Sequence, residues 1–135
     1  MYSLLVVDDE PAMRTLVVRL ARAAGYTVRE AGCAGEALDR MAESSSAVVI
    51  CDINMPDRSG LWLARQLRQQ FPDTALVMMS GFDDRELEAG LENGAMASLP
   101  KPFTREQLLR VLERAREWRP EHLANVVSSE QRTGK

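Results

Sequence analysis

The chain has 135 residues, of which 45% are hydrophobic and 27% charged, and its formal net charge is −3. This length suits one globular domain, and the slightly acidic balance gives no electrostatic basis for direct nucleic-acid binding. No apolar run approaches the roughly 20 residues that a membrane-spanning helix needs, and the N-terminus runs straight into a strand-like segment without room for a signal peptide, so we expect a cytoplasmic protein.

The first part of the chain alternates strand-like and helix-like segments. Ser3–Val7 is a short β-rich run, and Pro11 then suits the first turn of a helix. Gly25 ends that helix, in which apolar residues recur at helical spacing at Met13, Leu16, Val17, Leu20 and Ala24. A second strand over residues 26–31 and a second helix over residues 34–43 follow.

The same alternation continues to the end of the chain. The next segments are a strand over residues 47–52, a helix capped by Ser59, and a strand over residues 74–79. The helix expected over residues 83–92 has few apolar residues, which indicates mobility or a surface that faces a partner. A fifth strand over residues 95–99 precedes a last helix, which Thr104 and Gln107 open as a capping box. We expect Trp62 and Trp118 to be partly exposed.

Five strands that alternate with helices predict an α/β fold with one parallel sheet and helices on both of its faces. The most apolar strand segments, at residues 4–7, 48–50 and 76–79, should lie at the centre of the sheet. Cys33 and Cys51 lack the spacing of a metal site or redox motif, and we interpret both as small buried hydrophobic residues.

Polar residues follow several of these strands, and the C-terminal ends of parallel strands share one edge of a sheet. The residues are Asp8, Asp9, Asp52, Ser80 and Lys101. Taken singly, each has an ordinary explanation as a cap, a turn residue or a solvated loop residue. Together they predict a crevice in which crowded carboxylates need a hard divalent cation such as Mg²⁺. An aspartate there could act as a nucleophile toward phosphorus, with Lys101 and Ser80 beside the phosphoryl oxygens.

The sequence resembles the receiver domains of bacterial two-component response regulators. The resemblance spans about residues 3–117 and rests on four motifs: Val7-Asp8-Asp9-Glu10, Asp52-Ile53-Asn54-Met55-Pro56-Asp57-Arg58-Ser59-Gly60, Met79-Ser80-Gly81 and Lys101-Pro102-Phe103. It implies a flavodoxin-like strand order, 2-1-3-4-5.

By this resemblance Asp52 is the phospho-acceptor, which takes a phosphoryl group from a sensor histidine kinase, a phosphotransfer protein or a small phosphodonor. Lys101 would pair with the phosphoryl group, and Ser80 would shift toward it as the switch. The protein would then change its partner binding through the face formed by the fourth helix, fifth strand and last helix. Its chemistry would be limited to self-phosphorylation and slow Mg²⁺-dependent dephosphorylation, so it would not be an enzyme in the usual sense.

The resemblance also implies a set of metal ligands. Asp9 and Asp52 would bind Mg²⁺ directly, Asn54 would contribute its backbone carbonyl, and Asp8 would act through a metal-bound water. The Lys101–Pro102 peptide bond corresponds to one that is cis in the family.

One position departs from the family pattern. The residue three before the lysine is usually aromatic and swings inward on activation, but here it is Ser98. We expect that Phe82 or Met96 could take over this role by repacking the output face.

We divide the chain into a receiver domain, residues 1–118, and a C-terminal tail or linker, residues 119–135. The tail could be frayed, could support a homodimer, or could lead to an effector domain, and the output partner is unknown. Its single histidine, His122, is interpreted as a surface residue. Two other functions stay open: a degenerate receiver that acts as an interaction scaffold without phosphorylation, and a flavodoxin-type electron carrier. The carboxylates of Asp8-Asp9-Glu10 argue against the second, because they would repel a flavin phosphate.

Overall fold

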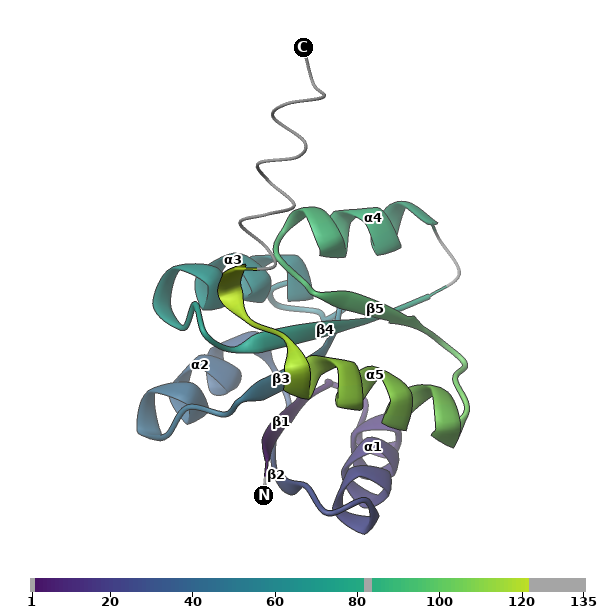
Figure 1. Cartoon of the computed structure of the whole chain (residues 1–135). Helices are drawn as coiled ribbons and strands as arrows, with labels where there is room; N and C mark the ends of the chain where they lie inside the picture. Colours follow the sequence, from purple (N-terminus) through teal and green to yellow (C-terminus); the bar gives the residue numbers. More distant parts are fainter. Residues whose placement is uncertain (1, 82–83, 122–135) are drawn as a thin grey trace.

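The structure is a computed structural model that describes residues 2–81 and 84–121. In this part of the chain five strands alternate with five helices, as the sequence predicts (Figure 1). Most element boundaries lie within one or two residues of their predicted positions. The elements are β1 Ser3–Val7, α1 Pro11–Ala23, β2 Thr27–Ala31, α2 Ala34–Glu43, β3 Val48–Asp52, α3 Gly60–Gln70, β4 Ala75–Ser80, α4 Asp84–Glu92, β5 Ala97–Pro100 and α5 Arg105–Glu117.

The strands form one parallel sheet in the order β2-β1-β3-β4-β5, which confirms the predicted fold class. In register, Val7 lies beside Cys51, and Asp52 lies beside Met79. Because every strand runs in the same direction, the residues that follow β1, β3, β4 and β5 emerge at one edge of the sheet. The fold therefore places the polar strand ends together before any side-chain interaction is considered.

Helices cover both faces of the sheet, as Figure 1 shows. Helices α1 and α5 pack on the face that carries Leu4, Val6 and Ile50, whereas α2 and α3 pack on the face that carries Leu5 and Val49. Successive strand residues thus point into opposite hydrophobic layers, and β3 and β4 are buried along their whole length. Helix α4 lies on the same side as α2 and α3, where its Gly90 approaches Met78 and Ile53.

Two helix starts agree with the sequence. The Ser59 hydroxyl accepts a hydrogen bond from the Trp62 backbone N–H at the start of α3. At the start of α5, Thr104 and Gln107 form the predicted capping box. The predicted core stripe of α5 is also confirmed, since each of its four residues is buried: Leu108, Val111, Leu112 and Ala115.

The burial of α1 and of two residues elsewhere differs from the prediction. Helix α1 buries Val17, Val18 and Ala21, while Leu16 is 43% exposed. The predicted stripe is therefore confirmed in part, since Val17 is buried and Met13 and Leu20 are half-buried against the same core, whereas Leu16 and Ala24 are exposed. Trp118, which follows α5, is buried in the core rather than partly exposed. Cys33 is only half-buried, whereas Cys51 is buried as expected.

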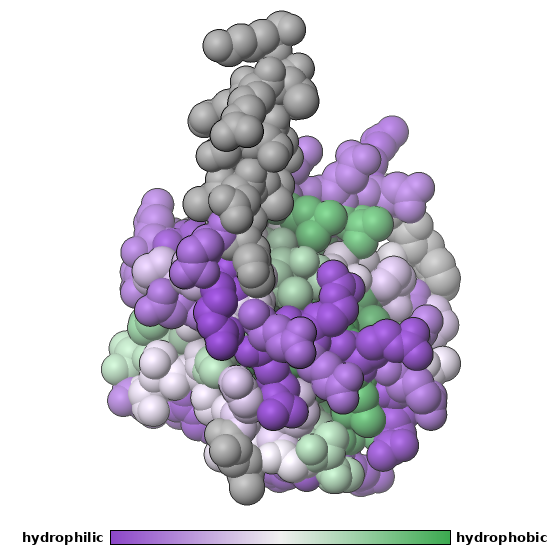
Figure 2. Space-filling view, in the orientation of Figure 1, coloured by the Kyte–Doolittle hydropathy of each residue, from purple (hydrophilic) through white to green (hydrophobic). Residues whose placement is uncertain are grey.

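Among residues 2–81 and 84–121, no helix has both the length and the apolar character that a membrane span requires. Figure 2 shows a mostly hydrophilic surface on the side in view, with hydrophobic residues gathered near α4. Only Gly90 of α4 is fully buried, and Leu91 is 44% exposed. The weak apolar pattern of this helix therefore corresponds to shallow packing on the sheet.

Candidate functional site

Three carboxylates converge where β1 and β3 end. Asp8 and Asp9 follow β1, and Asp52 is the last residue of β3. One carboxylate oxygen from each lies within 4.8 Å of the others. Asp8 and Asp52 are buried, and Asp9 is exposed. The strand order thus produces the acidic crevice that the sequence predicts.

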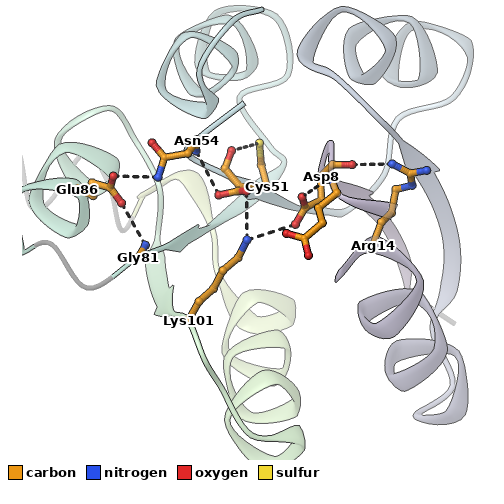
Figure 3. Close-up of polar contacts among 9 residues, drawn as sticks. Asp8, Arg14, Cys51, Asn54, Gly81, Glu86 and Lys101 are labelled. Carbon is orange, nitrogen blue, oxygen red and sulfur yellow. Dashed lines mark hydrogen bonds and ion pairs between the residues drawn. The ribbon is translucent and has the colours of Figure 1, made fainter. Parts of the chain in front are cut away.

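Lys101, which follows β5, extends into this crevice (Figure 3). Its Nζ lies 3.1 Å from Asp52 Oδ2 and 3.4 Å from Asp8 Oδ2, and it donates a hydrogen bond to each. Its backbone N–H donates to the Ser80 carbonyl at 2.7 Å, which joins the ends of β4 and β5. The Lys101–Pro102 peptide bond is cis, as the resemblance implies. One ammonium therefore contacts carboxylates from two different strand ends.

The electrostatics of the crevice reflect burial and charge together. Burial raises the pKa of the Asp52 carboxyl, although the Lys101 ammonium and the Asn54 N–H partly counter it. For Lys101, burial lowers the pKa, but hydrogen bonds and attraction from Asp52 and Asp8 outweigh burial and the pKa is raised. Formally, the three carboxylates and one ammonium leave a charge of −2. Lys101 alone does not neutralise the site.

The donor set fits a hard divalent cation. The groups that could bind a metal are carboxylate oxygens of Asp8, Asp9 and Asp52, and Mg²⁺ prefers oxygen ligands of this kind. A divalent cation would also cancel the formal charge of −2. The Asp8 carboxylate is held in place because its Oδ1 accepts the Glu10 N–H at 2.9 Å. Asn54 is close as well, since its backbone N–H donates to Asp52 Oδ1 at 3.1 Å. The residues at this edge are therefore suited to hold Mg²⁺.

Gly60 fixes the backbone behind Asp52. Its N–H donates to the Ile53 carbonyl at 2.8 Å, and a Cβ at this position would lie 2.4 Å from the Asp52 carbonyl oxygen. Only a residue without a side chain allows α3 to begin so close to the end of β3. The glycine in the long motif thus has a steric role in positioning the carboxylate.

Ser80 lies at the end of β4 and is 1% exposed. Its hydroxyl is 3.3 Å from the hydroxyl of Ser98, which is half-buried in β5. The sequence identified Ser98 only as a missing aromatic residue and did not indicate this contact. Of the two proposed substitutes, Met96 is half-buried against the α1 and α5 side of the core, and Phe82 lies outside the described residues.

Two further residues of the site were not found from the sequence. Glu86, in the first turn of α4, accepts hydrogen bonds from the Asn54 side chain and the Gly81 N–H. Arg14 of α1 donates to the Asp8 carbonyl at 2.7 Å and forms an ion pair with Glu30. The contact of Glu86 with Asn54 joins residues 32 apart in the chain, and that of Arg14 with Glu30 joins residues 16 apart, so no local motif indicates either.

Comparison with known proteins gives consistent results. Residues 4–113 match the family model described as the response regulator receiver domain. The response regulator MprA of Mycobacterium avium is 38% identical over 127 residues, which cover 93% of this chain and 56% of that protein. The sensor kinase CckA of Brucella abortus is 38% identical over 109 residues, which cover 78% of this chain and 12% of that protein. The chain therefore spans only part of these relatives.

Solved structures give the same fold. The chemotaxis response regulator CheY4 of Vibrio cholerae superposes with a TM-score of 0.79 at 32% identity, over 85% of this chain and 98% of that chain. The receiver domain of NtrX from Brucella abortus gives a TM-score of 0.81 at 32% identity, over 84% of this chain and 98% of that chain.

The family match favours the receiver over the flavin-binding alternative. Receiver domains partner with histidine kinases and are not conventional enzymes, and an acidic triad such as Asp8, Asp9 and Asp52 is typical of their Mg²⁺ site. The sequence match over most of the chain, the strand order and the acidic crevice all agree. This chain belongs to the response regulator receiver domain family of two-component signalling.

Proposed function

We propose that this protein is a phosphorylatable switch that carries a phosphoryl group on Asp52. The observation that best supports this proposal is the position of Lys101, whose ammonium contacts both Asp52 and Asp8 at the edge where the strands end. A cation fixed beside a buried carboxylate is suited to stabilise the oxygens of a transferred phosphoryl group.

The reaction is an in-line displacement at phosphorus. An Asp52 carboxylate oxygen forms a bond to the phosphorus atom, and the bond between phosphorus and the donor's leaving atom breaks, with its electron pair departing on the leaving group. The donor is the phosphohistidine of a sensor kinase or phosphotransfer protein, or a small phosphodonor. Lys101 pairs with the phosphoryl oxygens, and Ser80 donates its hydroxyl to one of them. Slow hydrolysis of the acyl phosphate returns Asp52 to its carboxylate.

Asp9 and Asp52 would bind Mg²⁺ directly, Asn54 through its backbone carbonyl and Asp8 through water. When bound, this ion offsets the negative charge of the carboxylates and phosphoryl oxygens. Asp8 additionally holds Lys101 in place through its contact with Nζ. Asp9 is exposed, whereas Asp8 is buried and its Oδ1 already accepts the Glu10 N–H.

The signal would leave through the face formed by α4, β5 and α5, with residues 1–118 as the receiver domain and residues 119–135 as a tail or linker. The cognate kinase and the output partner or effector domain would meet the protein in the cytoplasm. Support for this output face comes from the Ser80 and Ser98 contact, which connects the site to β5.

Intact-mass measurement after incubation with acetyl phosphate and Mg²⁺ tests the proposal. We expect the wild-type chain to gain one phosphoryl group, and Asp52→Asn or a chelator to abolish the gain. Asp57→Asn is a matched control, since Asp57 is an exposed aspartate of the same β3–α3 connection and should leave labelling intact. Failure of the wild type to gain mass would favour the scaffold alternative, and stoichiometric labelling of Asp52→Asn would disprove the acceptor assignment.

A further inference from the structure

Glu86 connects two parts of the candidate site through one carboxylate. Its Oε2 accepts a hydrogen bond from Asn54 Nδ2 at 2.9 Å, and its Oε1 accepts one from the Gly81 N–H at 3.1 Å. Asn54 follows β3, Gly81 follows β4, and Glu86 belongs to the first turn of α4. Figure 3 shows these contacts beside the Lys101 and Asp8 pair. A side chain of α4 is thus bonded to the residues that follow β3, which ends at Asp52, and β4, which pairs with β3.

These contacts exceed what a helix terminus needs. An acidic residue in the first turn stabilises a helix through the macrodipole even when it is solvated, and Asp84 also occupies that turn. Glu86 instead reaches two donors outside its own helix, one of them 32 residues away in the chain. The Glu86 carboxylate therefore bonds to residues of the candidate site as well as belonging to the first turn of α4.

The Gly81 N–H is a donor that a phosphoryl group on Asp52 would need. It comes directly after Ser80, and β4 pairs with β3 so that Met79 lies beside Asp52. A positioned backbone N–H can donate to an anionic oxygen. The Asn54 N–H already donates a hydrogen bond to Asp52 Oδ1, whereas the Gly81 N–H donates to Glu86 Oε1. In the unphosphorylated protein, the Glu86 carboxylate therefore accepts the Gly81 N–H, a donor that would otherwise suit a phosphoryl oxygen.

We propose that Glu86 is a positioning residue that competes with the phosphoryl group for the Gly81 N–H. This inference rests on the proposed phosphorylation of Asp52. When phosphorylation gives Gly81 a new acceptor, the Glu86 carboxylate loses that hydrogen bond, and the first turn of α4 is no longer bonded to the end of β4. The competition therefore couples Asp52 to α4 without requiring an aromatic residue at position 98.

The negative charge of Glu86, like its hydrogen bond to Gly81, opposes phosphorylation of Asp52. Asp8, Asp9, Asp52 and Lys101 already leave a formal charge of −2, and phosphodonors are anionic. Another carboxylate at this edge adds repulsion that a donor must overcome, and the part acting through solvent is screened by salt. Removing Glu86 should therefore speed phosphorylation and strengthen binding of a phosphoryl mimic.

Three variants separate hydrogen bonding from charge. Glu86→Ala removes both contacts and the charge. Glu86→Gln removes the charge and keeps one oxygen that can accept from the Gly81 N–H, but its amide nitrogen cannot accept from Asn54 Nδ2. Glu88→Gln removes the same charge from an exposed position on the same helix and is the matched control. Circular dichroism and thermal unfolding establish that each variant is folded.

We expect Glu86→Ala to raise both the initial rate of labelling by acetyl phosphate with Mg²⁺ and the affinity for beryllofluoride with Mg²⁺ by about tenfold or more, the size expected for release from a hydrogen bond to a charged group. Glu86→Gln should gain less, and Glu88→Gln should stay within about twofold of wild type, as expected for an exposed charge. Equal gains for Glu88→Gln and Glu86→Ala, or a loss in Glu86→Ala, would overturn the inference.

The Gly81 amide reports the exchange of acceptors directly. In protein labelled with ¹⁵N-glycine, we expect its amide resonance to differ between wild type and Glu86→Ala without beryllofluoride and to converge when beryllofluoride and Mg²⁺ are bound. A wild-type resonance that does not move on binding would overturn the inference. If the wild type is labelled but the Glu86 variants match it, this inference alone fails. If the wild type neither binds beryllofluoride nor accepts a phosphoryl group, the proposed function fails with it.

Discussion

Lys101 is the residue that most directly holds the acidic crevice together, because its ammonium bonds to Asp52 and Asp8. Lys101→Ala leaves two buried carboxylates without this partner, so in the presence of a chelator we expect the free energy of unfolding to fall by about 1–3 kcal/mol. Urea denaturation monitored by circular dichroism measures the change. Some labelling by acetyl phosphate should remain, but its coupling to partner binding should be lost. A variant as stable as the wild type would show that the ion pair contributes little to folding.

The ionised Asp52 carboxylate destabilises the folded protein, whereas Lys101 stabilises it. Burial raises the pKa of Asp52 because it disfavours the charged form. Without Mg²⁺ at neutral pH, Asp52→Asn should therefore unfold at a higher temperature than the wild type. The folded wild type takes up a proton on Asp52 at a higher pH than the unfolded chain does, so its stability rises relative to the variant as the pH falls through that pKa. The difference between the two melting temperatures should narrow on acidification. A gap that widens toward low pH would contradict this account.

At the scale of the elements, the junction of β3 and α3 depends on Gly60. A Cβ there would lie 2.4 Å from the Asp52 carbonyl oxygen, so we expect Gly60→Ala to lower the free energy of unfolding by about 1–3 kcal/mol. Labelling of Asp52 should slow as well, because the backbone behind the carboxylate must move. Denaturant titration and the acetyl phosphate assay measure the two effects.

Gly35 provides the matched control for that substitution. It lies in α2, and a Cβ at this position would meet nothing within 4 Å. Gly35→Ala should be neutral or stabilise the protein by up to about 1 kcal/mol, since alanine favours a helix more than glycine does. Equal destabilisation by both substitutions would remove the steric argument for Gly60.

The sequence predicted elements well where a strong local signal exists and less well where packing decides. Residues of α5 carry both a capping box and a clear stripe, and both were predicted. Helix α1 has apolar residues on more than one side, so tertiary contact with the sheet selects the face that contains Val18 and Ala21 and leaves Leu16 exposed. Trp118 is buried for the same reason, because its environment is formed by the core and not by its neighbours in the chain.

At the scale of the whole molecule, the candidate site follows from topology. Once the strands are parallel, the positions of Asp8, Asp52 and Lys101 at strand ends are enough to bring them together. The contacts of Glu86 with Asn54 and of Ser98 with Ser80 could not be predicted in the same way. They join side chains 32 and 18 residues apart, and they depend on how α4 and β5 lie against the ends of β3 and β4.

Binding of Mg²⁺ should stabilise the folded protein as a whole, because the carboxylates come together only after folding. Thermal unfolding should shift upward by several degrees in excess Mg²⁺, a change of about 2–3 kcal/mol when the ion is present at about 100 times its Kd. Asp9→Asn should lose most of this shift. Asp57→Asn, which removes an exposed carboxylate nearby, should keep it. An equal loss in the two variants would point to general screening instead of a defined site.

Reductive trapping with borohydride identifies which carboxylate of the chain carries the phosphoryl group. Borohydride converts an aspartyl phosphate to homoserine, which peptide sequencing by mass spectrometry locates in the chain. After incubation with acetyl phosphate and Mg²⁺, we predict homoserine at position 52 and none at position 8, 9 or 57. Homoserine at another position, or at none while the protein retains its phosphoryl group, would contradict the assignment of Asp52.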